Sequence, residues 1–179
     1  MHVRRVVTAR QPSGKSVLVS DGASPREVAL RYTPGFVSAP IWKTDAMPAL
    51  PFGGIDPMAT ESSLLPGPGG STFLIVTFPP DSVMAASDFR PELAVPEHMA
   101  ASPGIAETFE SESPGMHTTP TVDYACVMGG EIWLELDDNV LVHLKQGDTV
   151  VQHGARHAWR NRGSQPATLA FVLIGARSV

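Results

Sequence analysis

Two histidines and an aspartate are the residues best suited to do chemistry in this sequence. His117 and Asp123 lie on either side of a threonine-rich stretch, and His157 follows further downstream. If the chain is extended from His117 onward, alternate side chains share a face, so His117 and Asp123 point the same way as Thr119. Two imidazoles and a carboxylate form a ligand set that suits Fe, Mn, Ni or Zn and leaves positions for water or substrate.

Composition limits the classes of protein and partner to consider. The chain has 179 residues, 42% of them hydrophobic, which is enough to bury the core of one domain. Its formal net charge is −5, and it has no basic stripe interleaved with aromatic residues. Nucleic acid and anionic membrane are therefore disfavoured as partners. We expect a single domain that binds a small molecule.

The sequence also bears on location. The longest apolar run, residues 169–175, is far shorter than a membrane span. The basic N-terminus breaks at Gln11-Pro12 before the apolar part of a signal peptide develops. The single cysteine, Cys126, lies in an apolar strand pattern and cannot form an intramolecular disulfide. We therefore expect a cytoplasmic protein.

Sixteen glycines and seventeen prolines interrupt the chain at short intervals, which favours an all-β fold. Turn residues 11–14 should join an N-terminal hairpin, and residues 28–57 should be extended chain with at most one edge strand. Residues 81–114 lack a pattern apart from a short helical piece at 105–109, and a connection of this length is typical of a lid or binding loop. Strands are expected at 71–80, 123–128, 131–136, 140–144, 149–152 and 167–174.

The stretch around His117 resembles the first sequence motif of the cupin superfamily. That motif is a glycine, two histidines separated by one residue, a glutamate, and a glycine after six more residues. With Asp123 at the glutamate position, Gly130 follows after six residues. His117 then occupies the first histidine position and Thr119 the second.

The stretch around His157 is similar to the second cupin motif, a glycine, a proline-x-glycine, a histidine after two residues and an asparagine after three more. Here Gln152 replaces the proline, and Gly154, His157 and Asn161 follow at the motif spacing. The distance from the first glycine is one residue shorter than in the usual form. Order, spacing and flanking strands agree over residues 115–161, which is stronger than a single motif.

The resemblance implies an all-β double-stranded β-helix, also called a jelly roll or cupin barrel, as in small single-domain cupins. We expect one cupin domain over residues 1–179. Residues 1–66 would form an N-terminal β-hairpin and proline-rich extension, and residues 67–179 the barrel, with a long loop before the first motif.

In metal-binding cupins three histidines and a glutamate hold the metal. This chain departs from that set at two positions, where it has Thr119 and Asp123. The resemblance therefore implies either a divalent transition metal (Fe, Mn, Ni or Zn) held by His117, Asp123 and His157, or a site without metal that keeps its polar side chains.

Two functions are consistent with these residues. The first is an enzyme in which His117, Asp123 and His157 are catalytic and hold a metal for lyase, isomerase, decarboxylase or oxygenase chemistry on a small organic metabolite. A metal-free form would use His117 as a general base oriented by Asp123. The second function is a non-catalytic cupin that binds a small ligand as a sensor or accessory protein, with a degenerate metal site.

Three further residues are expected to line the pocket. Thr119 would contribute a hydroxyl, and Trp159 and Phe73 would contribute apolar walls. Trp159 shares strand parity with His157. As a partner in assembly, we expect a second copy of the chain, because a homodimer is the common state of the family.

Overall fold

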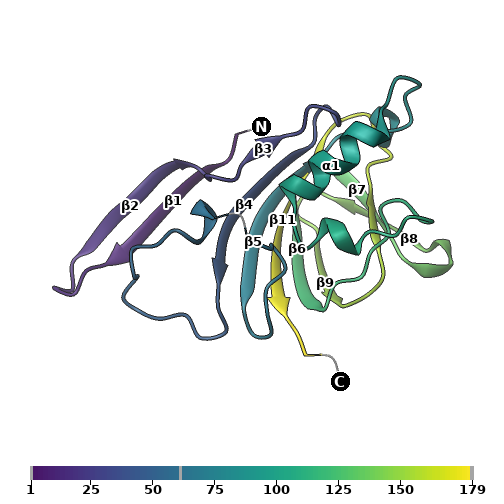
Figure 1. The fold of residues 1–179 in the computed structure, drawn as a ribbon. Coiled ribbons are helices and arrows are strands. Elements are labelled where there is room, and N and C mark those ends of the chain that lie inside the picture. The colour runs from purple at the N-terminus through teal and green to yellow at the C-terminus, as the bar shows by residue number, and fades with distance from the viewer. Residues whose placement is uncertain (1, 61, 178–179) are drawn as a thin grey trace.

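The chain folds into antiparallel β-sheets crossed by one α-helix (Figure 1). The computed structural model describes residues 2–60 and 62–177. The strands of these described ranges are β1 (Arg4–Arg10), β2 (Ser16–Ala23), β3 (Val28–Ala29), β4 (Val37–Thr44), β5 (Ser71–Phe78), β6 (Thr121–Gly129), β7 (Glu131–Glu135), β8 (Leu141–Lys145), β9 (Thr149–His153), β10 (Ala158–Arg160) and β11 (Ala167–Gly175). The helices are α1 (Pro91–Ala101) and the single turns η1 (Pro57–Ala59), η2 (Asp81–Val83), η3 (Ala106–Thr108) and η4 (Asp137–Asn139).

Two of the sheets pack face to face and enclose the core. One has the strand order β3-β4-β5-β11-β6-β9, and the other has the order β10-β7-β8. Apolar side chains from both sheets fill the space between them, including Leu74 of β5, Val127 of β6, Ile132 of β7 and Leu169 of β11. This is the jelly-roll arrangement predicted from the sequence, although over the described residues the two sheets stay hydrogen-bonded separately and do not close into one barrel.

The predicted N-terminal hairpin is present as β1 and β2. The two strands pair from Arg4 with Ala23 at one end to Arg10 with Ser16 at the other. They form a sheet of their own that extends away from β4 (Figure 1). Arg5 attaches this hairpin to the rest of the molecule, because its guanidinium donates hydrogen bonds to the carboxylate of Asp56 and to a main-chain carbonyl of β4.

The proline-rich segment contributes more strand than the sequence indicated. β4 is an internal strand that pairs with β3 on one side and with β5 on the other, so the expectation of at most one edge strand was wrong. Pro40 is tolerated because it falls where the register of β4 against β5 shifts, between Pro40 and Trp42. The six-stranded sheet therefore uses residues on both sides of position 66.

The connection between β5 and β6 contains a helix that the sequence pattern did not reveal. α1 buries only Ala94 and Ala101 and includes Pro96, so it lacks the apolar stripe by which a helix is usually recognised. η3 coincides with the short helical piece expected at 105–109. In Figure 1 α1 crosses in front of the sheets. Among the described residues, no helix is long and apolar enough to cross a membrane.

Packing between the two sheets should dominate the stability of the fold. Leu169 is fully buried, whereas Met47, outside the hairpin, is 90% exposed. We expect Leu169→Ala to lower the free energy of unfolding by about 2–5 kcal/mol, because it removes buried methyl groups and leaves a cavity. Met47→Ala should change it by less than about 0.5 kcal/mol. Urea denaturation of both variants measures these changes, and equal losses would contradict this account of the core.

Candidate functional site

The structure brings His117 and His157 into direct contact. The main-chain N–H of each histidine donates to the carbonyl oxygen of the other, at 2.9 and 3.0 Å. Their ring centroids are 4.2 Å apart, and the rings are tilted by 49°. The two residues are 8% and 3% exposed, respectively. The two motif stretches therefore meet at one buried point between the sheets.

Backbone carbonyls determine the tautomer of both rings. Nδ1 of His117 lies 3.0 Å from the carbonyl oxygen of Gly115, and Nδ1 of His157 lies 2.8 Å from that of Ala155. A carbonyl oxygen can only accept, so each Nδ1 carries the proton. A neutral ring then has its lone pair on Nε2. Each histidine can thus act as a base or as a ligand through Nε2.

Burial keeps these two histidines neutral at physiological pH. Burial, and after it the neighbouring His157, lower the pKa of His117 to about 4, against opposing effects from Gly115, Asp123 and Glu110. Burial also lowers the pKa of His157. Because both pKa values lie below the ordinary value, neither ring is charged near pH 7.

Asp123 lies on β6 with its side chain in the interior. Burial along this segment alternates as strand parity predicts, with Asp123 inside and Tyr124 outside. Asp123 is 7% exposed, and among the described residues its Oδ1 atom has no hydrogen-bond partner. Burial raises the pKa of this carboxyl, against a hydrogen bond from Thr121 and attraction from His117 that lower it. Burial thus shifts the equilibrium of this carboxyl in the direction of the protonated acid.

Gln152 is a site residue that the sequence reasoning missed. It lies on β9 directly opposite Asp123 and is 5% exposed. Its Oε1 atom likewise has no hydrogen-bond partner within the described part of the chain. The available signal was its position in the second motif, where glutamine replaces proline. Without the register of β9 against β6, however, nothing in the sequence placed it opposite Asp123.

The three residues expected to line the pocket have different positions. Thr119 is buried, and its hydroxyl lies 2.7 Å from that of Thr121. Trp159 contacts the His157 ring edge-on, with centroids 5.9 Å apart, and also packs on Phe171 of the core. Phe73 packs instead with a second apolar cluster around Ile75, outside the space between the two sheets. The structure therefore does not bring Phe73 to the histidines.

Two of the three expected ligands are well suited to bind a metal ion. The two Nε2 atoms are suitable donors, since each ring is oriented by a carbonyl at Nδ1. In residues 2–60 and 62–177, however, no three His, Cys, Asp or Glu side chains are grouped closely enough to hold a metal. In this conformation His117, Asp123 and His157 are therefore not drawn together as three ligands around one point.

Comparison with known proteins finds relatives from fungi. No family model matches the chain. It is 42% identical over 65 residues to phomopsin biosynthesis cluster protein C' of Diaporthe leptostromiformis, covering 36% of this chain and 34% of that protein. Oryzines biosynthesis cluster protein J of Aspergillus oryzae is 37% identical over 67 residues, covering 37% of each chain. The cupin-domain-containing oxidoreductase virC of Hypocrea virens is 33% identical over 67 residues, covering 36% and 34%. The match thus spans about a third of each relative.

Solved structures give a weaker likeness. A cupin domain of a transcriptional regulator from Enterobacter cloacae is 13% identical, covering 80% of this chain and 99% of that one, with a TM-score of 0.42. An ethanolamine utilization protein from Salmonella typhimurium is 8% identical, covering 99% of both chains, with a TM-score of 0.44. The two motifs, the jelly-roll sheets and the relatives named as cupin-domain proteins agree in supporting the resemblance to the cupin superfamily.

Acid should destabilise the protein through His117. An unfolded imidazole takes up a proton near the ordinary value of 6.5, whereas in the folded state the pKa is about 4. Between these values the unfolded state binds more protons, so the free energy of unfolding falls as the pH drops through this window. Above the window neither state is charged and the effect vanishes. The full shift corresponds to about 3 kcal/mol.

Urea denaturation of chelator-treated protein at about pH 7 and about pH 4.5 measures this loss. The variant His117→Gln should lose less stability than the wild-type protein over the same interval. Protonation of Asp123 changes the free energy of unfolding in the opposite direction. Both proteins contain Asp123, so this contribution cancels when their losses are compared. Identical losses would mean that His117 is not the buried base described above.

Proposed function

We propose that this protein is a small-molecule cupin enzyme that transfers protons on a small organic metabolite, with the His117–His157 pair as its base. One observation carries the proposal: each histidine donates its Nδ1 proton to a backbone carbonyl and so presents an unprotonated Nε2. Two neutral, buried bases beside a carboxyl whose pKa is raised are the components of general acid–base catalysis.

Each side chain has its own role in the proposed reaction. Nε2 of a histidine accepts a proton from a carbon next to a carbonyl, while Asp123, in its protonated form, gives its proton to the carbonyl oxygen, which yields an enol. Return of the proton to another carbon gives an isomer, and departure of a leaving group gives the product of a lyase. The second histidine supplies a further unprotonated Nε2, and the paired main-chain hydrogen bonds hold the two residues side by side.

The chemistry of the interior also indicates the kind of substrate. Oδ1 of Asp123 and Oε1 of Gln152 are buried acceptors without a partner among the described residues. An interior rich in acceptors favours a ligand that brings hydroxyl or N–H donors, because unpaired buried acceptors are costly. The relatives named for the phomopsin and oryzines clusters support a role in natural-product biosynthesis, with a hydroxylated carbonyl compound as the substrate class.

Proton exchange with solvent tests this function directly. The protein is incubated in D₂O with a panel of small hydroxyketones and hydroxyaldehydes, and loss of the proton next to the carbonyl is followed by NMR. His117→Ala and His157→Ala should each lower the exchange rate by about 10²–10⁴-fold, the usual contribution of a general base. His143→Ala is the matched control, since His143 is an exposed histidine stacked on Trp133.

A metal held by His117, Asp123 and His157 is the second candidate, favoured by the orientation of the two Nε2 donors. The same assay separates the candidates. Exchange that survives exhaustive chelation supports the metal-free mechanism. Exchange that chelation abolishes and one transition metal restores, with binding lost in His157→Ala, would replace it. Ligand binding with no exchange at all would instead favour a sensor or accessory protein.

A homodimer is a further part of the proposal. The hairpin of β1 and β2 exposes Val6, Leu18 and Val19, and an isolated two-stranded hairpin is at best marginally stable in water. We expect a second copy to cover this hairpin. Light scattering should give the mass of two chains for the wild-type protein and a smaller average mass for Leu18→Glu. A wild-type protein with the mass of one chain would contradict the dimer.

A further inference from the structure

The proposed base is largely shielded from solvent in this structure. His117 and His157 are 8% and 3% exposed, so a substrate has little access to their rings unless a neighbouring segment moves. The chain from residue 107 to 115 passes directly over this point. None of its residues is buried, whereas Ala106 before it and Met116 after it both are. This segment can therefore leave the surface with little loss of core packing.

Phe109 provides the cover over the histidines. Its ring lies edge-on to the ring of His117, with centroids 4.7 Å apart and an interplanar angle of 83°. The two residues also form an isolated antiparallel bridge, in which the N–H of Glu110 donates to the carbonyl oxygen of Met116 at 2.9 Å. Phe109 is 42% exposed, so one ring is all that separates His117 from water on this side.

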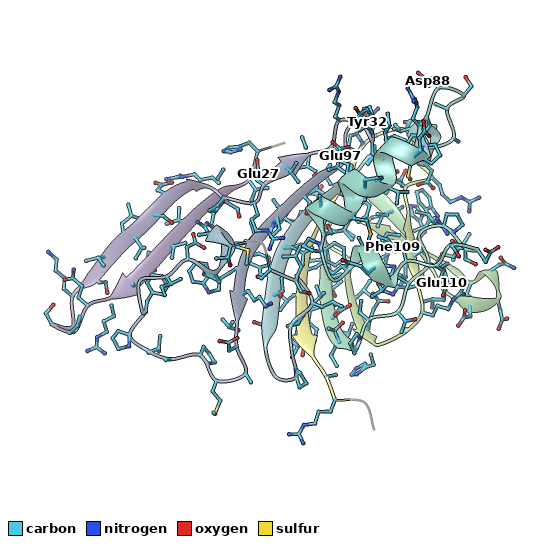
Figure 2. All side chains as sticks on the ribbon, viewed as in Figure 1. Glu27, Tyr32, Asp88, Glu97, Phe109 and Glu110 are labelled. Atoms are coloured by element: carbon cyan, nitrogen blue, oxygen red, sulfur yellow. The ribbon has the colours of Figure 1, made fainter. Side chains whose placement is uncertain are left out.

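Glu110 fastens the segment to the body of the protein. Its carboxylate receives two hydrogen bonds from Arg156, both 2.6 Å long, and Arg156 also donates to Asp137 at 2.6 Å. Figure 2 shows Glu110 next to Phe109 on the segment in front of the strands. A second arginine, Arg160, donates to the carbonyl oxygen of Pro114 at 2.8 Å. Arg156 directly precedes His157, so the fastening and the base share one stretch of chain.

The surroundings leave room for movement. Gly115, at the C-terminal end of the segment, has a φ of +87°, a conformation that other residues rarely adopt. A cleft of about 470 Å³ lies between the segment and the three-stranded sheet. Ser113 and Pro114 line one side of it, and Arg156 and Arg160 line the other. The segment is thus attached along this side mainly by exposed polar groups.

We propose that residues 107–115 form a lid over the His117–His157 pair and that the Glu110–Arg156 ion pair holds the lid closed. The lid admits substrate to the base when this ion pair separates. Its purpose rests on the proposed function, but the closure itself depends only on the contacts described above.

The rate of chemical modification of His117 measures how accessible the lid leaves this residue. Diethyl pyrocarbonate acylates neutral imidazole nitrogen. The full-length protein is modified and then digested, and mass spectrometry of the peptides gives a modification rate for each histidine. His153 is exposed and serves as the internal reference. A partly exposed ion pair changes a local equilibrium by only a few-fold. We therefore expect Glu110→Gln to raise the modification rate of His117 about twofold to fivefold, with the rate of His153 unchanged.

Further variants make the test specific. Glu112→Gln changes an exposed carboxylate of the same segment, which accepts a hydrogen bond from the adjacent Ser111 and does not contact Arg156. It should leave the rate at His117 unchanged. Arg156→Gln should raise the rate like Glu110→Gln, and the double variant should add nothing beyond the larger single effect. Phe109→Ala should raise the rate further because it removes the ring over His117.

The proposal fails if Glu110→Gln leaves His117 as protected as in the wild-type protein, or if Glu112→Gln exposes it equally. Hydrogen exchange distinguishes lid opening from general unfolding. In Glu110→Gln the amides of residues 107–115 should exchange faster than in the wild-type protein, while those of β6 should exchange at the same rate. If β6 also exchanges faster, the ion pair supports the fold rather than a lid. The reagent reports access and not turnover, so the lid and the proton-transfer function can fail independently.

Discussion

The reciprocal main-chain hydrogen bonds between His117 and His157 are the contact on which the site depends. They join two stretches of chain that are distant in sequence, one leading into β6 and one leading into β10. Because β6 belongs to the six-stranded sheet and β10 to the three-stranded sheet, this short bridge also links the two layers. The imidazoles are held by the same backbone that holds the layers together, so the geometry of the base is as rigid as the fold.

Placing polar groups at this point has an energetic cost. The histidines are kept neutral by burial, and Asp123 and Gln152 each have an oxygen without a partner among the described residues. A protein selected only for stability would place apolar side chains here, as it does at Ala125 and Val127 further along β6. The change from polar to apolar along one face of one strand marks the boundary between site and core.

Much of this could be predicted from the sequence, and the failures have physical causes. The face shared by His117, Thr119 and Asp123 followed from the period of a strand, because β6 alternates between a buried and an exposed face. β5 does not alternate, since its central residues Leu74, Ile75 and Val76 are all buried. The side on which Phe73 lies therefore could not be read from its neighbours. The contacts of Phe109 and Glu110 depend on how a patternless connection returns to the sheets, which no local period encodes.

The position of Gln152 has a consequence for the turn between β8 and β9. β9 is an edge strand that pairs only with β6, over five residue pairs, so its register depends on that short ladder and on the turn that precedes it. In this turn the side chain of Asp148 accepts from the N–H of Lys145, and the N–H of Gly147 donates to the carbonyl oxygen of Val127. A slip of one residue would place Val151 or His153 opposite Asp123 and turn Gln152 outward. The length of this solvent-exposed turn therefore determines, through the register of β9, which side chain faces Asp123 inside the site.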